Sequence, residues 1–305
     1  GAIVGVALAV GVVLLIEYLD DTIRTTESAA QVLALPVLGG IVRFGKKNDS
    51  YSQRLVTQQV TMSPVSEGYR TVRTNLMFAA DGATKGIFLI TSAGPEEGKS
   101  LTAANLAITL AQADLQVLLI DCDLRRPKQH EIFGLKNEVG LTTLLGKTYE
   151  SIGSKRLEEG KLPLSLLQCL QTTTLGKLWV ITSGFIPSNP TEILGSSSMQ
   201  FWIDVFRASP EIDVVILDTP PCLLATDSSV LAATSKADVL MVVDSRRTRR
   251  GAAQKAKEQF VQLGLTVRGV ILNRVNPREE SYEYNYNYGY YYYAPAMSPE
   301  KARSL

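Results

Sequence analysis

The chain has 305 residues, enough for one large α/β domain and additional segments. Its 31 basic and 30 acidic side chains nearly cancel, so the charge balance gives no reason to expect a nucleic-acid partner. The three cysteines, Cys122, Cys169 and Cys222, lack the spacing of a zinc site or a disulfide framework, which favours a reducing cytoplasm. The single histidine, His130, argues against a multi-histidine metal site and against a Ser-His-Asp triad.

The chain begins with an apolar stretch. Residues 1–16 are apolar or glycine without interruption, slightly fewer than the ~20 residues that a bilayer core requires. They lack the basic region and the small-residue cleavage site of a signal peptide. Because the chain starts at Gly1 without a methionine, we interpret residues 1–19 as the end of a transmembrane helix in a fragment of a longer protein. A buried core helix is the alternative.

A juxtamembrane segment and linker are expected over residues 20–63. Residues 17–35 resemble a helix that leaves the membrane, and Leu35–Gly40 breaks it before a short strand at 41–44. Residues 45–63 are polar, as in a solvated linker. A helix over about 65–79 then opens the main domain, which we place at residues 64–276.

Apolar runs alternate with helical patterns through the main domain, and we expect helices at about 99–112, 199–208 and 251–263. The expected strands are near-continuous apolar runs, as in strands that are covered on both faces. They lie at residues 87–91, 117–121, 178–182, 214–218, 239–244 and 267–273. This pattern predicts a doubly wound, mostly parallel sheet.

A phosphate-binding loop follows the first of these strands. Residues 92–100 read SAGPEEGKS and lead into a helix, which is the context that a Walker A loop requires. Ala93 replaces the usual first glycine, and a coincidental Gly-Lys-Ser turn is the alternative. Loop amides and the helix N-terminus bind phosphate oxygens in such sites. The expected nucleotide contacts come from Ala93, Gly94, Glu97, Gly98, Lys99, Ser100 and Leu101.

Aspartates end two further strands. Asp121 and Asp123 follow one apolar run and Asp218 ends another, in a Walker B pattern. Together with the Ser100 hydroxyl they can hold Mg²⁺ directly or through water. An aspartate at a strand end is often only a cap or turn residue, but three at the edge that carries a phosphate loop favour a metal site.

Eight of the twelve tyrosines lie within twelve residues near the C-terminus. A core rarely uses tyrosine in this way, because each buried phenol needs a hydrogen-bond partner. We expect residues 277–305 to be disordered and to expose a set of phosphate acceptors. These acceptors are Tyr282, Tyr284, Tyr286, Tyr288, Tyr290, Tyr291, Tyr292 and Tyr293.

With these motifs the chain resembles the bacterial protein-tyrosine kinases of capsule and exopolysaccharide synthesis. Residues 90–100 (ITSAGPEEGKS), 119–127 (LIDCDLRRP) and 216–221 (ILDTPP) are similar to that family's Walker A, Walker A′ and Walker B motifs. Glu67, Arg70 and Arg73 match its oligomerisation motif, and residues 184–192 (GFIPSNPTE) match a further signature. Residues 1–44 resemble the end of the polysaccharide co-polymerase that many members carry in the same chain.

The resemblance implies roles for individual residues. Lys99 would bind the β and γ phosphates of ATP, and Ser100, Asp123 and Asp218 would hold Mg²⁺. Asp121 would accept the tyrosine proton. Its competing role would be to hold Mg²⁺ indirectly, from outside the set of direct ligands. Asn273 and Arg274 end the last strand, where related folds contact adenine.

The resemblance also implies partners. It indicates a ring-shaped homo-oligomer at the inner membrane, with an octamer as one possible size. Within the ring, the C-terminal tyrosines of one chain would be phosphorylated in trans by another. Other expected partners are the polysaccharide polymerisation and export machinery and a phosphotyrosine phosphatase. Two alternatives remain at this stage: an ATP-switched scaffold without kinase activity, and a partition-type ATPase of the deviant Walker A class. Gly94 stands where partition ATPases carry their signature lysine, which argues against the second.

Overall fold

The computed structural model describes residues 1–45, 49–58, 63–79, 85–146, 162–277 and 279. Within these residues, eight strands form one sheet in the order β1-β8-β7-β2-β6-β3-β5-β4. All neighbouring strands are parallel except β4 and β5, which pair in antiparallel fashion. The strands are β1 (Val37–Val42), β2 (Gly86–Ser92), β3 (Val117–Asp121), β4 (Gln171–Thr172), β5 (Leu178–Ile181), β6 (Val214–Asp218), β7 (Asp238–Asp244) and β8 (Val267–Val275).

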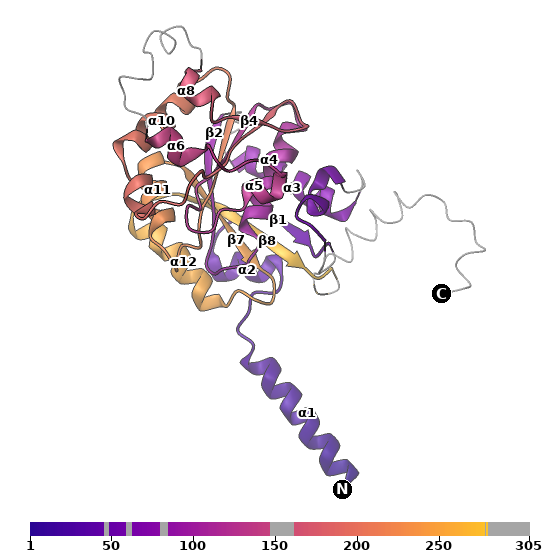
Figure 1. Cartoon of the computed structure of the whole chain (residues 1–305). Helices are drawn as coiled ribbons and strands as arrows, with labels where there is room; N and C mark the ends of the chain where they lie inside the picture. Colours follow the sequence, from indigo (N-terminus) through magenta and orange to yellow (C-terminus); the bar gives the residue numbers. More distant parts are fainter. Residues whose placement is uncertain (46–48, 59–62, 80–84, 147–161, 278, 280–305) are drawn as a thin grey trace, which may run out of the picture.

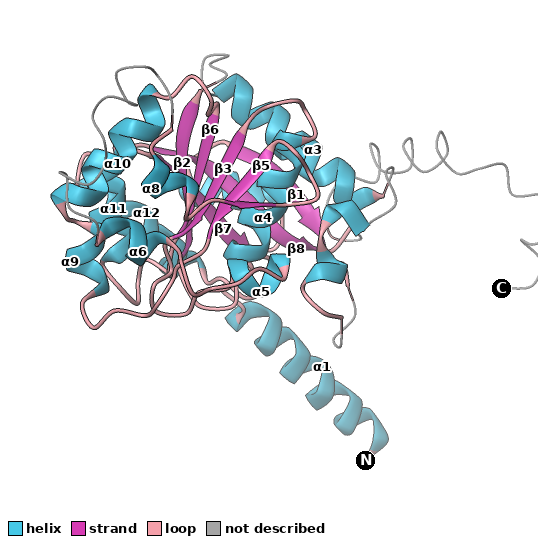
Figure 2. Cartoon of the chain, turned by 45° about the horizontal axis from the view of Figure 1, so that its top comes forward, coloured by secondary structure: helices cyan, strands magenta, loops and turns pink. Residues whose placement is uncertain are grey.

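Helices cover both faces of this sheet (Figure 2). One face packs on α3 (Pro64–Ala79), α4 (Lys99–Ala111) and α5 (Gln129–Phe133). The other face packs on the remaining helices and on the residues between them. These are α2 (Thr26–Leu33), α6 (Leu141–Leu145), α8 (Leu164–Leu167), α9 (Pro190–Leu194), α10 (Ser197–Ala208), α11 (Asp227–Ser235) and α12 (Arg250–Gln262). Two 3₁₀ turns, η1 (Ser52–Arg54) and η2 (Val56–Gln58), lie between β1 and α3.

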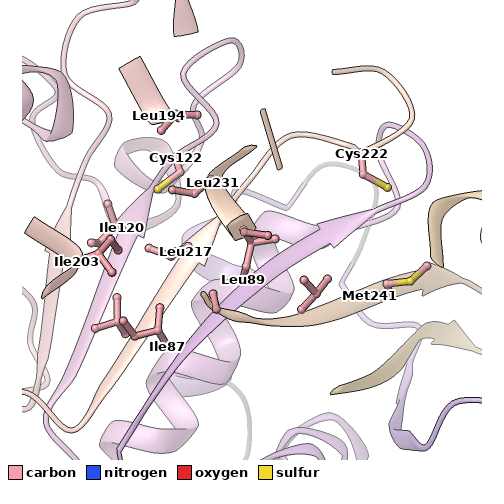
Figure 3. Close-up of a cluster of buried hydrophobic side chains, with 14 of the residues drawn as sticks. Ile87, Leu89, Ile120, Cys122, Leu194, Ile203, Leu217, Cys222, Leu231 and Met241 are labelled. Atoms are coloured by element: carbon pink, nitrogen blue, oxygen red, sulfur yellow. The ribbon is translucent and has the colours of Figure 1, made fainter. Parts of the chain in front are cut away.

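Alternation along each strand explains why every apolar run is buried on both sides. In β2, Ile87 and Leu89 face one cluster while Phe88 and Ile90 face the other. Figure 3 shows the first cluster, in which Leu217 of β6 lies among side chains from the neighbouring strands and helices. Full burial of such a side chain contributes about 1.5–3 kcal/mol to folding. Burial on both faces therefore stabilises the central strands, whose carboxyl ends form one edge of the sheet.

The doubly wound sheet confirms the predicted fold class, and the six predicted strands are all present to within two residues of their expected ends. The helices predicted at 65–79, 99–112, 199–208 and 251–263 correspond to α3, α4, α10 and α12. The tail prediction for residues 280–305 lies outside the described residues.

The N-terminal segment differs from its prediction. Helix α1 (Ala2–Leu19) stands apart from the other elements (Figure 1), and α2 is a separate helix rather than its continuation. The strand expected at 41–44 is β1, at Val37–Val42, and it pairs with β8. The sheet therefore begins upstream of residue 64, in the segment for which the sequence predicts a linker. In the part of the chain that the structure describes, no helix combines the length and apolarity needed to cross a membrane.

Glycine explains the misplaced strand. The sequence pattern predicts a break at Gly39 and Gly40, but both lie inside β1. A Cβ on Gly39 would stand 2.7 Å from Cγ2 of Val72, and one on Gly68 would stand 2.9 Å from the carbonyl oxygen of Gly40. The glycines therefore allow α3 to lie close against β1.

Candidate active site

The phosphate loop joins β2 to α4 at the carboxyl edge of the sheet. Gly98 precedes the first helical residue with φ +92°, a conformation that favours glycine. A Cβ there would also stand 2.1 Å from Nδ2 of Asn273. The first amides of α4 have no partner within the helix, so they point into the loop as donors for an anion.

The neighbouring strand ends brace this loop. Asn273 Nδ2 donates to the carbonyl oxygen of Glu97 at 2.9 Å, and Arg274 donates to that of Glu96 at 3.0 Å. Glu97 is buried, which raises its pKa, and its Oε1 accepts a hydrogen bond from Thr248 at 2.7 Å. The structure thus brings Asn273 and Arg274 to the phosphate loop, while their expected contact with adenine stays a prediction.

Lys99 is the cation at the centre of the site. Its Nζ lies 2.8 Å from Oδ2 of Asp123 and 3.3 Å from Oγ of Ser100. Burial alone would lower the pKa of Lys99, but the carboxylates of Asp218 and Asp123 outweigh burial and raise it. The side chain therefore remains a full positive charge in a largely buried position, where it interacts strongly with a phosphate.

Asp121 is buried at the end of β3. Its Oδ2 accepts hydrogen bonds from the backbone amides of Lys128 and Gln129, at 2.9 and 2.8 Å, whereas Oδ1 accepts the amide of Asp123 at the longer distance of 3.3 Å. Burial and the nearby charge of Asp218 raise the pKa of Asp121 to about 8. One oxygen thus holds the loop that follows β3, while the other retains acceptor capacity.

Gln129 is a site residue that the sequence did not reveal. Its side chain is fully buried, and Nε2 donates to Oδ2 of Asp218 at 2.8 Å and to the carbonyl oxygen of Ser100 at 3.0 Å. It therefore links the Walker A helix to the Walker B aspartate. Its only signal in the sequence is its position two residues after Pro127, at the start of the short helix α5.

The donor set suits Mg²⁺. Asp218 Oδ1 is buried and has no hydrogen-bond partner among the described residues, and burial raises the pKa of this carboxyl. A cation would satisfy that oxygen and favour its ionised form. Ser100, Asp123 and Asp218 supply one hydroxyl and two carboxylates, which suits an ion that is usually held by one or two carboxylates together with substrate phosphates.

The predicted oligomerisation residues lie on α3. Glu67 and Arg70 form an ion pair along the helix, and Arg73 donates to the carbonyl oxygen of Thr109 at 3.2 Å. An exposed pair of this kind contributes only about 0.2–0.5 kcal/mol, so it can be exchanged for a partner on another subunit at little cost. The eight acceptor tyrosines lie outside the described residues.

Comparison with known proteins shows the family of the domain that carries this site. Residues 88–291 match the family of CobQ/CobB/MinD/ParA nucleotide binding domains. The chain is 41% identical over 208 residues to tyrosine-protein kinase YwqD of Bacillus subtilis, covering 68% of this chain and 80% of YwqD. The chain belongs to the bacterial tyrosine-protein kinases. This confirms the resemblance that the Walker motifs indicated.

Two further comparisons are with a longer relative and with a solved structure. This kinase is 32% identical over 239 residues to tyrosine-protein kinase wzc of Salmonella typhimurium, covering 78% of this chain but only 31% of wzc. The kinase domain of Escherichia coli tyrosine kinase ETK superposes with a TM-score of 0.64 at 29% identity, covering 79% of this chain and 91% of that domain. The shared part is thus the nucleotide-binding domain.

Proposed function

We propose that this kinase uses ATP and Mg²⁺ to phosphorylate the tyrosines of residues 282–293 on neighbouring copies of the same chain. The convergence of Lys99, Asp121, Asp123 and Asp218 at one edge of a parallel sheet carries the proposal. Strand β8 ends at this edge too, because it is parallel to β2 and β6 through β7. Tyr282 lies nine positions after Asn273, at most ~30 Å of extended chain.

Each group has a distinct part in the transfer. Lys99 and the loop amides bind and orient the β and γ phosphates, and Ser100, Asp123 and Asp218 would hold Mg²⁺, which supplies charge neutralisation when bound. Asp121 accepts the tyrosine proton through Oδ1, the oxygen that the Lys128 and Gln129 amides do not bind. Positioning and charge account for most of the catalysis.

We assign the reaction to the control of capsule or exopolysaccharide polymerisation and export, through assembly and disassembly of a ring. Glu67, Arg70 and Arg73 would pair across subunits, and residues 1–19 would attach the ring to the inner membrane, with the catalytic domain in the cytoplasm. Each phosphotyrosine adds about −1.5 to −2 charges, so eight would add on the order of −12 to −16 to each tail. Repulsion between such tails favours dissociation, and a phosphatase would reverse it.

One substitution tests the assignment of the site. Lys99→Met removes the charge that binds the phosphates, so we expect it to abolish phosphotyrosine formation with ATP and Mg²⁺. Lys255→Met is the matched control, because Lys255 is an exposed lysine on α12. Full tyrosine labelling in the Lys99→Met chain contradicts the assignment.

A further inference from the structure

Two pairs of consecutive apolar side chains are exposed on loops at the catalytic edge of the sheet. Phe185 and Ile186 follow β5 and are 60% and 63% exposed, while Leu223 and Leu224 follow β6 and are 40% and 67% exposed. Single exposed apolar residues are common on proteins. Two pairs of consecutive exposed apolar residues at the edge that carries a reactive site are less common. Exposed apolar surface of this kind often marks a binding site. The reaction as described above uses none of the four.

Hydrogen bonds join the loop after β6 to the phosphate loop, and the connection after β5 to α11. The backbone amide of Cys222, directly before the leucine pair, donates to the carbonyl oxygen of Ser92 at the start of the phosphate loop, at 2.9 Å. Phe185 and Ile186 lie on the connection from β5 to α9, and Thr191 of α9 donates to Oδ1 of Asp227 at the start of α11.

Arg125 joins the two loops from the strand between them. It follows Asp123 by two residues, and its guanidinium donates to both oxygens of Asp227, at 2.7 and 3.0 Å, and to Oγ1 of Thr191, at 3.3 Å. Asp227 is fully buried, whereas the Arg125 side chain remains 47% exposed. Arg126, the next residue, is exposed as well. The surface therefore combines apolar side chains with two guanidinium groups.

The tyrosine-rich tail has the complementary chemistry. Residues 279–293 contain Glu279, Glu280 and Glu283 and no lysine or arginine, in addition to the eight tyrosines. Phenol rings pack on apolar side chains while their hydroxyls stay available, and guanidinium groups attract both aromatic faces and carboxylates. An acidic, aromatic segment fits this surface better than a basic one does.

We propose that Phe185, Ile186, Leu223 and Leu224, together with Arg125 and Arg126, bind residues 282–293 of a second copy and present their hydroxyls to the phosphate site. This inference rests on the proposed function and names its substrate-binding surface. In the same chain, Glu279 pairs with Arg246 directly after β7 and turns back to Asn276. Tyr282 follows by three residues, ~10 Å at most, whereas β3 lies three strand spacings from β7, ~14 Å, so the first tyrosine does not reach this surface in its own chain. The later tyrosines lie farther along the tail and do not have this limit. A second copy has no such constraint.

Direct binding tests the surface without catalysis. The probe is a fluorescent peptide of residues 279–296, and the protein is the full chain with serine at all eight tail tyrosines, so that its own tail does not compete. We expect Phe185→Ser with Ile186→Ser, and separately Leu223→Ser with Leu224→Ser, to weaken binding about tenfold or more by fluorescence anisotropy. Val261→Ser with Leu263→Ser, 53% and 56% exposed at the end of α12, is the control and should bind as the parent does. Equal affinity in all variants overturns the proposal.

Kinetics then separate this surface from the chemistry. The same variants, as phosphate donors, should raise the KM for a Lys99→Met acceptor chain about tenfold while the KM for ATP stays unchanged. Loss of self-association in parallel with labelling would instead assign these side chains to the subunit interface and overturn the proposal. If the peptide binds at this surface but no chain is labelled, the proposed function fails and the surface stands. If labelling proceeds and substitution of neither apolar pair affects it, the proposed binding surface is overturned while the proposed function stands.

Discussion

The hydrogen bond between Gln129 and Asp218 offers a quantitative test of the site. Gln129→Ala removes one bond to a carboxylate, about 1.5–3 kcal/mol, and one to a neutral carbonyl, about 0.5–1.5 kcal/mol. The Gln129 Oε1 atom is buried without a partner among the described residues, and its removal returns about 1–3 kcal/mol. The expected net loss is about 1–1.5 kcal/mol, or roughly 2–6 °C in Tm for a domain of this size.

A double-mutant cycle isolates the bond itself. Urea unfolding of the full chain, followed by the fluorescence of the buried Trp202, gives the free energies for Gln129→Ala, Asp218→Ala and the double variant. We expect a coupling of about 1.5–3 kcal/mol, because the bond joins a charged group in a buried position. Gln112→Ala, an exposed glutamine at the end of α4, should change stability by no more than about 0.5 kcal/mol. A coupling below about 0.5 kcal/mol refutes the assigned role of Gln129.

Three further predictions concern the loops of the site. Gly98→Ala strains a positive φ and brings a Cβ against Asn273, so its affinity for ATP, measured by calorimetry, should fall at least about tenfold. Gly176→Ala is the control, because a Cβ on Gly176 meets open space, and this variant should bind ATP as the parent does. Asp227→Asn should cost about 1.5–3 kcal/mol at pH 7. Because Arg125 and Thr191 lower the pKa of Asp227 against the effect of burial, that cost should shrink as the pH falls below the unfolded value of about 3.9, and a pH-independent cost in urea melts contradicts the ion pair. Asp121→Asn keeps an oxygen for the Lys128 and Gln129 amides but removes the base, so kcat should fall about 10²–10⁴-fold with ATP affinity little changed; a wild-type kcat excludes Asp121 as proton acceptor.

The parts of the site that continuous segments encode could be predicted from sequence. The apolar runs that end at Asp121 and Asp218 are parallel strands, so their carboxyl ends meet at one edge beside the phosphate loop. The spacing of Gly98, Lys99 and Ser100 places the loop at a helix start. These inferences need only strand polarity and local backbone conformation.

Tertiary contacts explain what the sequence did not reveal. Gln129 acts on Asp218, 89 residues away, and Arg125 on Asp227, 102 residues away, so no local pattern identifies either pair. The same limit applies to Gly39. From sequence it is typical of a break between two elements, and only the position of Val72 on α3 explains a glycine inside a strand. Contacts that depend on the packing of two distant segments carry no periodic signal in either one.

Transfer between chains tests the central claim most directly. A Lys99→Met chain with all its tail tyrosines is mixed with an active chain that carries serine at these eight positions, and phosphotyrosine is measured after incubation with radiolabelled ATP and Mg²⁺. We predict label on the Lys99→Met chain, because the active chain supplies the site and its partner supplies the acceptors. Absence of label in the mixture, when the unmodified chain labels itself, contradicts transfer in trans.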